Sequence, residues 1–425
     1  MKIAFLLFSD KLSSYKFCIG ETNPGIGGTQ FTTIQLALRL AELYNNWEIS
    51  LVNTTSIQID KKNINIILSS NVNEFLITEQ ATQMNVVVAT IQSMRGIDLE
   101  LLKKISNRIV AWSHHPYDDR LRYLDGLVPF GAVVSVGAYQ FYSNKWLRSP
   151  SFFIQNIFMP LVLSADELRC HLDKDQPVLV HLGALVSGKG FLYIAQQWPK
   201  IKEKFPGAKF HIIGGSDLYR NTEQHDLIPV TPALARSILE YITRDDLEQG
   251  SVKFHGNLGA EKFDILKQAH VALQNPTGAT EAFPASTLEC MSVGLPVIAS
   301  ADFGMWDSMR FFSELQLQKP SQIVEKLHWL LEDERRYIAT SERAKSVAID
   351  FSRNTDDILT RWTLLLKAVS AGNAESLELE TPMPKPKSAW HFSQRIIREH
   401  GRLMLSLTPI GSVWRKLKAA LARKQ

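Results

Sequence analysis

Short runs rich in valine and isoleucine alternate with longer segments of helical periodicity along the first part of the chain. Runs that are apolar on both faces and are separated by helices indicate a parallel sheet covered on both sides. The predicted strands are Ile3–Phe8, Glu48–Asn53, Asn85–Thr90, Arg108–Ser113 and Ala132–Val136, and the predicted helices include Thr29–Tyr44 and Ala138–Leu147.

A second series of the same kind begins near Pro177. Its predicted strands are Val178–Leu182, Lys209–Ile213, Val252–His255, Val271–Gln274 and Pro296–Ala299, with helices over Gly190–Lys204, Pro232–Gln249, Ala260–Ala269 and Ala285–Val293. The pattern predicts an α/β protein made of two Rossmann-like, doubly wound domains that face each other across a cleft. Open sheets of this kind bind ligands at the carboxyl ends of their strands.

Changes in composition divide the chain further. We predict a first domain over residues 1–163 and a second over 177–350, joined by a connection within Ser164–Gln176. The chain stays mostly helical to about Ala368, which predicts a C-terminal helix over 351–370 that returns toward the first domain. The stretch 371–388 contains three glutamates and several prolines and is typical of a linker, and a basic tail follows over 389–425.

Composition is that of an ordinary soluble protein, with 45% hydrophobic and 21% charged residues. No apolar run approaches the roughly 18 residues that span a bilayer. The apolar start, Met1–Phe8, is too short for a signal peptide, and the three scattered cysteines indicate a reducing compartment. We therefore expect a cytoplasmic protein.

The tail is much more basic than the net charge of the whole chain indicates. Ten Lys and Arg residues and only Glu399 fall between Lys385 and Gln425, a net charge of +9, so the remainder of the chain has −5 against a total of +4. Two apolar stripes run among the basic residues, made of Phe392, Ile396, Leu403 and Leu407, and of Val413, Trp414, Leu417 and Leu421. Such helices suit an anionic membrane surface on the inner face of the membrane, or pack on the protein body or on a partner.

The segment from Thr280 to Ser300 carries the most chemistry. Two glutamates, Glu281 and Glu289, stand eight residues apart, and a helix N-terminus is predicted between them. Free N–H groups at a helix N-terminus attract phosphate, and carboxylates accept hydrogen bonds from hydroxyls. This combination suits a sugar nucleotide, which has hydroxyls at both ends and a diphosphate between them.

Two further loops favour an anionic ligand. Gly27 and Gly28 follow the opening strand and precede a helix, so their amides could approach a phosphate, although a plain flexible loop explains them as well. The loop differs from G-x-G-x-x-G directly after a strand, which argues against a nicotinamide dehydrogenase. In the second series, Lys189 follows a strand and a glycine turn at Gly183, where it could neutralise a diphosphate or simply lie on the surface.

Candidate polar groups are also found in the first series. His114 and His115 follow the strand Arg108–Ser113, which places one of them at the cleft, where a histidine could bond a sugar hydroxyl or only satisfy loop carbonyls. No histidine, cysteine or aspartate spacing is typical of a metal site, and Asp173-Lys174-Asp175 is more typical of a solvated charge run. We predict no structural or catalytic metal.

These motifs together resemble one known family. Glu281-x7-Glu289 within TEAFPASTLECMSVGLPVIAS is similar to the signature of the retaining glycosyltransferases of the GT-B fold, family four. The stretches GIGGTQF, VVSVGAYQFY, HLGALVSGKG and VKFHGNLGAEKFDILKQAHVALQNP also resemble that family, and the resemblance extends from about Met1 to Ala368.

The resemblance implies roles for the candidate residues. Glu281 would contact hydroxyls of the donor sugar, Glu289 the ribose, and Lys189 the diphosphate, with His114 or His115 in the place of the family's active-site histidine. The remaining donor-binding residues would be Gly27, Gly28, Gly183, Phe283, Ala285 and Ser286. The first domain would then take the acceptor and the second domain the donor.

The resulting prediction is a metal-independent, retaining glycosyltransferase without a cofactor. Its substrates would be a nucleotide-sugar and a glycan or lipid-linked acceptor, and it would not bind nucleic acid. Ala184 stands where the family usually carries an arginine, and Pro284 stands where glycine is frequent. Ala184 makes a non-catalytic sugar-nucleotide-binding subunit one alternative, and a sugar-nucleotide epimerase of the same fold is another.

Overall fold

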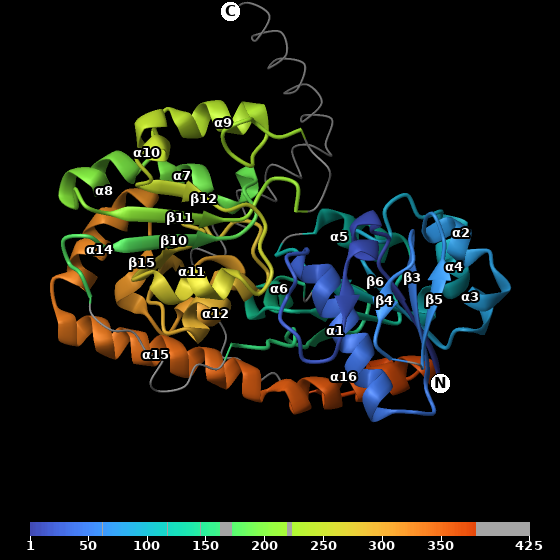
Figure 1. Cartoon of the computed structure of the whole chain (residues 1–425). Coiled ribbons are helices and arrows are strands. Elements are labelled where there is room, and N and C mark those ends of the chain that lie inside the picture. Colours follow the sequence, from blue (N-terminus) through green and yellow to red (C-terminus); the bar gives the residue numbers. More distant parts are fainter. Residues whose placement is uncertain (62, 117, 145, 162–171, 219–222, 380–425) are drawn as a thin grey trace, which may run out of the picture. The chain divides into compact units, whose positions relative to one another are not determined.

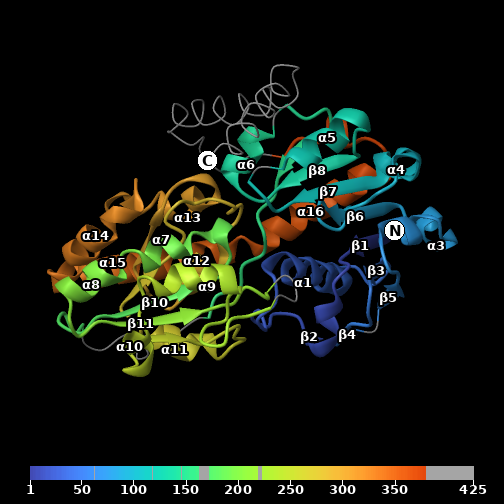
Figure 2. The ribbon, with the colours of Figure 1, turned by 90° about the horizontal axis from the view of Figure 1, so that it is seen from above.

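The first half of the chain folds around a parallel sheet with the strand order β5-β3-β1-β6-β7-β8-β9 (Figures 1 and 2). The computed structural model describes residues 1–61, 63–116, 118–144, 146–161, 172–218 and 223–379. The strands are β1 Lys2–Leu6, β3 Glu48–Asn53, β5 Ile64–Leu68, β6 Val86–Thr90, β7 Ile109–Ser113, β8 Ala132–Ser135 and β9 Ser151–Phe153. The short strands β2 Lys16–Phe17 and β4 Gln58–Ile59 pair separately.

Helices cover both faces of this sheet, as the apolar strands require. One core lies between the sheet and the helices α1 and α16, and includes Trp112 and Trp362, whose rings pack edge to face with centroids 4.7 Å apart. A second core lies on the opposite face, under α2 to α5. The helices are α1 Gly28–Leu43, α2 Val72–Leu76, α3 Glu79–Gln83, α4 Leu99–Ile105, α5 Asp119–Leu127, α6 Ala138–Ser143 and α16 Thr355–Ser370.

The second half repeats the architecture around a parallel sheet of order β12-β11-β10-β13-β14-β15. Its strands are β10 Val178–Leu182, β11 Lys209–Ile213, β12 Val252–Phe254, β13 Val271–Leu273, β14 Val297–Ser300 and β15 Gln316–Leu317. Helices lie on both sides of the sheet in Figures 1 and 2. They are α7 Phe191–Ala195, α8 Trp198–Lys204, α9 Pro232–Leu239, α10 Arg244–Glu248, α11 Lys262–Gln268, α12 Ala285–Ser292, α13 Trp306–Met309, α14 Ile323–Leu331 and α15 Glu334–Arg353.

The prediction of two parallel-sheet α/β domains with a helical C-terminal region is confirmed, but two predicted helices are each broken in two. The segment Gly190–Lys204 forms α7 and α8, and α8 starts afresh with a proline in its first turn. The segment Pro232–Gln249 forms α9 and α10, because Thr243 and Asp246 make a capping box that begins a new helix. Periodicity alone does not reveal these restarts.

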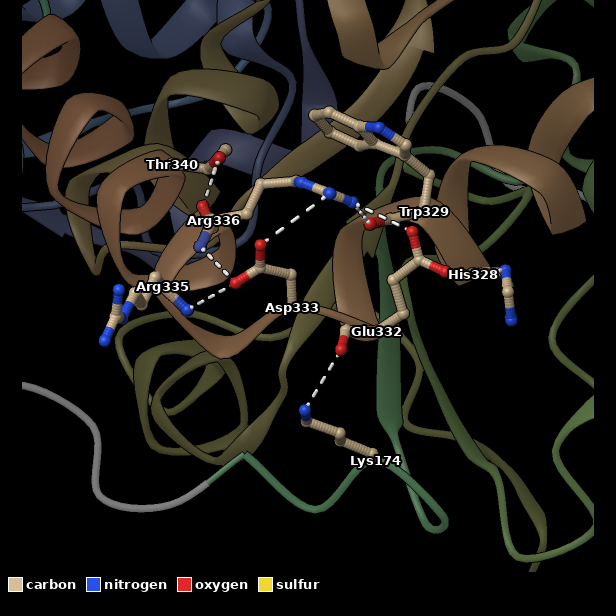
Figure 3. Close-up of polar contacts among 8 residues, drawn as sticks. All are labelled: Lys174, His328, Trp329, Glu332, Asp333, Arg335, Arg336 and Thr340. Carbon is tan, nitrogen blue, oxygen red and sulfur yellow. Dashed lines mark hydrogen bonds and ion pairs between the residues drawn. The ribbon is translucent and has the colours of Figure 1, made fainter.

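The turn between α14 and α15 is fixed by side chains at the start of α15 (Figure 3). Asp333 caps α15 by accepting hydrogen bonds from the amides of Arg335 and Arg336 at 3.0 and 3.2 Å. Both bonds lower the pKa of Asp333, and the bond from the Arg336 amide has the larger effect. Lys174, in the connection that precedes β10, donates to the carbonyl of Glu332 at 3.1 Å, so the connection is held against this turn.

The end of the described chain packs on the first half. Residues 374–376 form a 3-10 turn in which Ala374 is buried, and Leu377 and Leu379 pack against the core under α1 and α16. The predicted basic tail, 389–425, lies outside the described residues. No helix among the described ranges is both long and apolar enough to cross a membrane.

Asp307 joins the two halves at a buried position. Its carboxylate accepts a hydrogen bond from the amide of Ala138, the first residue of α6, at 3.1 Å, and the side chain has no exposed surface. Burial raises the pKa of Asp307 to about 7, although the Ala138 amide and the Arg310 guanidinium oppose the rise. The ionised form is therefore costly in the folded protein.

We expect this carboxyl to make stability fall as the pH rises from about 4 to about 7, because the folded state retains the proton that the unfolded chain loses near pH 3.8. At pH 8 the full cost is on the order of 4 kcal/mol. Asp307→Asn should raise the unfolding midpoint at pH 8 and leave it nearly unchanged at pH 4. Thermal unfolding of both proteins across this range measures the effect, and an equal midpoint difference at both pH values would contradict it.

Candidate active site

Glu281 and Lys189 form an ion pair although 92 residues separate them in the sequence. Lys189 ends a short 3-10 turn after β10, and Glu281 lies in the loop between β13 and α12. These strands are parallel neighbours, so the loops that follow them meet at one edge of the sheet. Nζ of Lys189 is 2.8 Å from Oε1 of Glu281, and the side chains are 20% and 12% exposed, so a ligand can still reach both.

The loop that carries Glu281 has a strained backbone. Thr280 has φ of +64°, which is rare for a β-branched residue, and its hydroxyl donates to the carbonyl of Gly188 at 3.2 Å. Asn275 holds the same loop by donating from its side-chain amide to the carbonyl of Ala279 at 2.8 Å. Strain of this kind persists where the surroundings enforce it, and it is concentrated at functional sites.

Glu289 forms a second and more deeply buried ion pair. Oε1 of Glu289, on α12, is 2.6 Å from Nζ of Lys262, the first residue of α11. The side chains are 15% and 4% exposed. Nζ of Lys262 also lies 3.5 Å from the carbonyl oxygen of Asn23 in the first half.

The N-terminus of α12 lies between the two glutamates in sequence. Pro284 occupies the N-cap position, and no side chain caps the helix. The amides of the first turn have no acceptors within the helix, so they can bind a phosphate. Proline itself supplies no N–H group, and the amide of Ala285 already donates to the carbonyl of Phe283 at 3.0 Å, so the amide of Ser286 would carry that role.

The glycine loop of the first half is ordered by Asn23. Its Oδ1 accepts hydrogen bonds from the amides of Gly25 and Ile26 at 3.0 and 2.9 Å. Gly25 has φ of +97°, and a β-carbon there would lie 3.1 Å from the carbonyl oxygen of Leu258. Glycine is thus required where this loop meets the loop before α11. Gly27 is the N-cap of α1, and Gly28 is its first residue.

Two cavities meet at the Lys189–Glu281 pair. The smaller, of about 180 Å³, lies among the glycine loop, the end of β10, Lys262 and α12. The larger, of about 1280 Å³, extends over the carboxyl ends of the first-half strands, including His114 and His115. The residues that line both are Gly28, Thr32, Lys189, Glu281, Phe283 and Ala285. The ion pair therefore stands where ligands in the two cavities would touch.

Comparison with known proteins bears on the fold and on the second half of the chain. Residues 176–333 match the family described as Glycosyl transferases group 1. Sucrose-phosphate synthase from Thermosynechococcus elongatus is similar in structure, with a TM-score of 0.59 and 15% identity over 87% of this chain and 99% of that protein. HepE from Anabaena, solved in complex with UDP-glucose, has a TM-score of 0.59 and 15% identity over 87% of this chain and 100% of the HepE chain.

The fold is GT-B. WaaG, a glycosyltransferase involved in lipopolysaccharide biosynthesis, is a further neighbour, with a TM-score of 0.55 and 15% identity over 87% of this chain and 99% of its own. No curated protein matches the sequence significantly. The matched domain and these neighbours support a GT-B glycosyltransferase.

In this GT-B fold the predicted site residues gather around the two cavities. Five of them line both cavities, namely Gly28, Lys189, Glu281, Phe283 and Ala285. Gly183, Ser286 and Glu289 line the smaller cavity, and His114 and His115 line the larger. Gly27 does not line either cavity and lies at the N-cap of α1. The structure brings these residues together, and their individual roles stay predictions.

His114 and His115 differ in their surroundings. Burial lowers the pKa of His114 to about 3, and its Nε2 atom is enclosed without a hydrogen-bond partner among the described residues. Burial also lowers the pKa of His115, partly offset by Asp118, and its Nε2 contacts the side-chain amide of Gln92 at 2.8 Å. Both rings are therefore neutral at pH 7, and either can hydrogen-bond a hydroxyl but not act as a cation.

The described residues contain no cluster of three or more histidine, cysteine, aspartate or glutamate side chains arranged for a metal. Whether the reaction proceeds without a metal or another cofactor stays a prediction.

Sequence reasoning did not single out two residues that line the smaller cavity. Lys262 falls in a stretch that resembles the family, but its buried contact with Glu289 depends on two segments that are distant in sequence. His181 is buried at the end of β10, where its Nδ1 bonds the carbonyl of Leu273 at 2.9 Å and burial lowers its pKa to about 4. The alternation of β10 could have shown that His181 points to one face, but not that a cavity lies there.

Proposed function

We propose that this protein transfers a glycosyl group from a nucleotide-sugar to a hydroxyl of an acceptor, with retention of the anomeric configuration. The observation that carries the proposal is the position of Lys189 and Glu281, which border both the smaller and the larger cavity. A donor in the smaller cavity would present its sugar to Glu281. An acceptor in the larger cavity would approach the same sugar from the first half.

The chemistry follows from where charge develops. As the bond between the anomeric carbon and the diphosphate breaks, negative charge grows on the departing phosphate. The Lys189 ammonium and the Ser286 amide in the first turn of α12 would stabilise that charge. Glu281 would accept hydroxyl hydrogen bonds from the donor sugar, and Glu289 would do the same for the ribose.

The acceptor would lose its proton to the departing phosphate on the same face of the sugar. In this scheme no side chain serves as the base, which agrees with the lowered pKa of His114 and of His115 in the larger cavity, because a lower pKa makes each ring a weaker base. These histidines would position acceptor hydroxyls. A glycan or a lipid-linked glycan supplies such hydroxyls, and we assign acceptor binding to the first half and donor binding to the second.

The decisive experiment is a screen of donors by thermal shift, with UDP-, GDP-, ADP- and TDP-sugars, followed by transfer assays with the best binder and a panel of glycan acceptors. The proposal expects one nucleotide class to raise the unfolding midpoint and to support product formation. Absence of both binding and transfer across all four classes would refute it.

A non-catalytic nucleotide-binding subunit is the second candidate, and Ala184 is the observation that favours it. The side chain lines the smaller cavity at the end of β10, where the family usually carries an arginine. Binding of a nucleotide-sugar without transfer by the natural chain, together with transfer by Ala184→Arg, would favour this candidate.

We also propose that the basic tail binds an anionic membrane surface and thereby brings the enzyme to a lipid-linked acceptor at the inner face of the membrane. A chain that ends at Lys387 loses eight of the ten basic residues and both apolar stripes. It is expected to stay in the supernatant with vesicles containing anionic lipid, whereas the full chain sediments with them. Equal sedimentation of the two chains would contradict the proposal, and neutral vesicles serve as the control for non-specific binding.

A further inference from the structure

The charges that line the smaller cavity are balanced before any ligand enters. The charged side chains among its described lining residues are Lys189, Lys262, Glu281 and Glu289, and they are matched as two ion pairs. His181, the histidine in this wall, is neutral at pH 7. A nucleoside diphosphate brings several negative charges into this space. The loss of either lysine would leave the cavity with a net negative charge and would oppose the ligand.

Lys262 is placed at a cost to stability. Its side chain is 4% exposed, and it is the first residue of α11, where the helix dipole disfavours a cation. Its ion pair with Glu289 offsets this cost. A pair of well-packed apolar residues would fill the same space without any cost of burying charge. Such an arrangement is more readily explained by a ligand that uses the charge than by folding.

Lys262 also connects the elements that would enclose a nucleotide. It bonds Oε1 of Glu289, which leaves Oε2 able to accept hydrogen bonds from ligand hydroxyls. It also lies 3.5 Å from the carbonyl oxygen of Asn23, the residue whose side chain orders the glycine loop. One ammonium thus fixes the orientation of Glu289 and links it to the loop of the opposite half.

We infer that Lys262 is a positioning residue for the nucleoside diphosphate part of the donor. It holds Glu289 ready for the ribose and supplies the second cation of a cavity that has alanine at position 184. This inference rests on the proposed function, because it assigns a part of the same donor site. It extends that function by adding a residue that couples nucleotide affinity to the glycine loop.

The test is calorimetric titration of the full chain with UDP, GDP, ADP and TDP, followed by titration of variants with the nucleotide that the natural chain binds best. Lys262→Met is expected to weaken binding about 10- to 100-fold, as the loss of a charge-assisted contact does. Lys262→Arg should recover most of the affinity. Lys209→Met, which removes an exposed lysine at the start of β11, should bind like the natural chain.

Binding of the matching nucleoside separates positioning from simple charge attraction. If Lys262 positions Glu289, Lys262→Met weakens nucleoside binding too, and adding Glu289→Gln to Lys262→Met causes little further loss. If Lys262→Met does not fold, Lys262→Gln replaces it in the same binding measurements, with the same expected results.

Nucleotide affinity within twofold of the natural value in the Lys262 variant would overturn the inference while leaving the proposed function intact. Failure of the natural chain to bind any of the four nucleotides, together with absence of transfer from the corresponding nucleotide-sugars, would overturn both.

Discussion

Glu281→Gln and Lys189→Met are each expected to lower kcat for glycosyl transfer by about 10²- to 10³-fold, the loss typical of removing one group that stabilises charge in a transition state. The two side chains contact each other at 2.8 Å and border both cavities, so Glu281 would touch the donor sugar and Lys189 the departing phosphate during reaction. The effect should fall on kcat more than on KM, because the charge on the phosphate develops only as the bond breaks.

Each single variant also breaks the ion pair between Lys189 and Glu281, and a double variant that removes both charges is the control for that effect. Removing one partner leaves the other partly buried and without its counter-charge, so each single variant should also lose stability. The double variant Lys189→Met/Glu281→Gln is neutral and should recover stability without recovering transfer. Initial rates at saturating donor, together with urea unfolding of all four proteins, measure the two effects separately. A double variant that transfers sugar at the natural rate would rule out a catalytic role for the pair.

Gly214→Ala is expected to destabilise the second half by about 3 kcal/mol or more. Gly214 follows β11 with φ of +136°, a conformation that alanine rarely adopts, and a β-carbon there would overlap the carbonyl group of Gly183. Gly183 and Ala184 line the smaller cavity, so relief of the overlap would displace the turn that faces the ligand. Nucleotide affinity should therefore fall together with stability.

Gly250→Ala is the matched control for this prediction. Gly250 also has a positive φ, +72°, but a β-carbon there would meet nothing within 4 Å. It should therefore cost only about 1–2 kcal/mol, the backbone term alone. Urea unfolding monitored by circular dichroism gives both values, and an equal loss in the two variants would show that the overlap with Gly183 is unimportant.

Several elements could be predicted closely because their signals are local. The strands Glu48–Asn53, Val178–Leu182 and Lys209–Ile213 were expected with the bounds that the structure has, since each is a short apolar run beside clear turn residues. The short edge strand β9 was missed, because Ser151–Phe153 has no alternation long enough to distinguish it from a loop. Its strand conformation depends on pairing with β8.

The candidate site divides in the same way. The sequence indicated Glu281, Glu289 and Lys189, because carboxylates beside a helix start and a lysine after a glycine turn have recognisable local patterns. It did not indicate that Lys189 and Glu281 would pair with each other. It also did not indicate Lys262, whose partners on α12 and in the glycine loop are distant in the chain.

By itself the sequence determined the alternation of strands and helices, the two-domain α/β architecture and the residue types that suit a nucleotide-sugar. These follow from periodicity, turn chemistry and charge, which act over a few neighbouring residues. Tertiary structure decided which charges meet, how deeply each is buried, and that two cavities share one wall at Lys189 and Glu281. Those properties arise when parallel strands bring distant loops to one edge of a sheet. Burial then sets how strongly the charges on those loops interact.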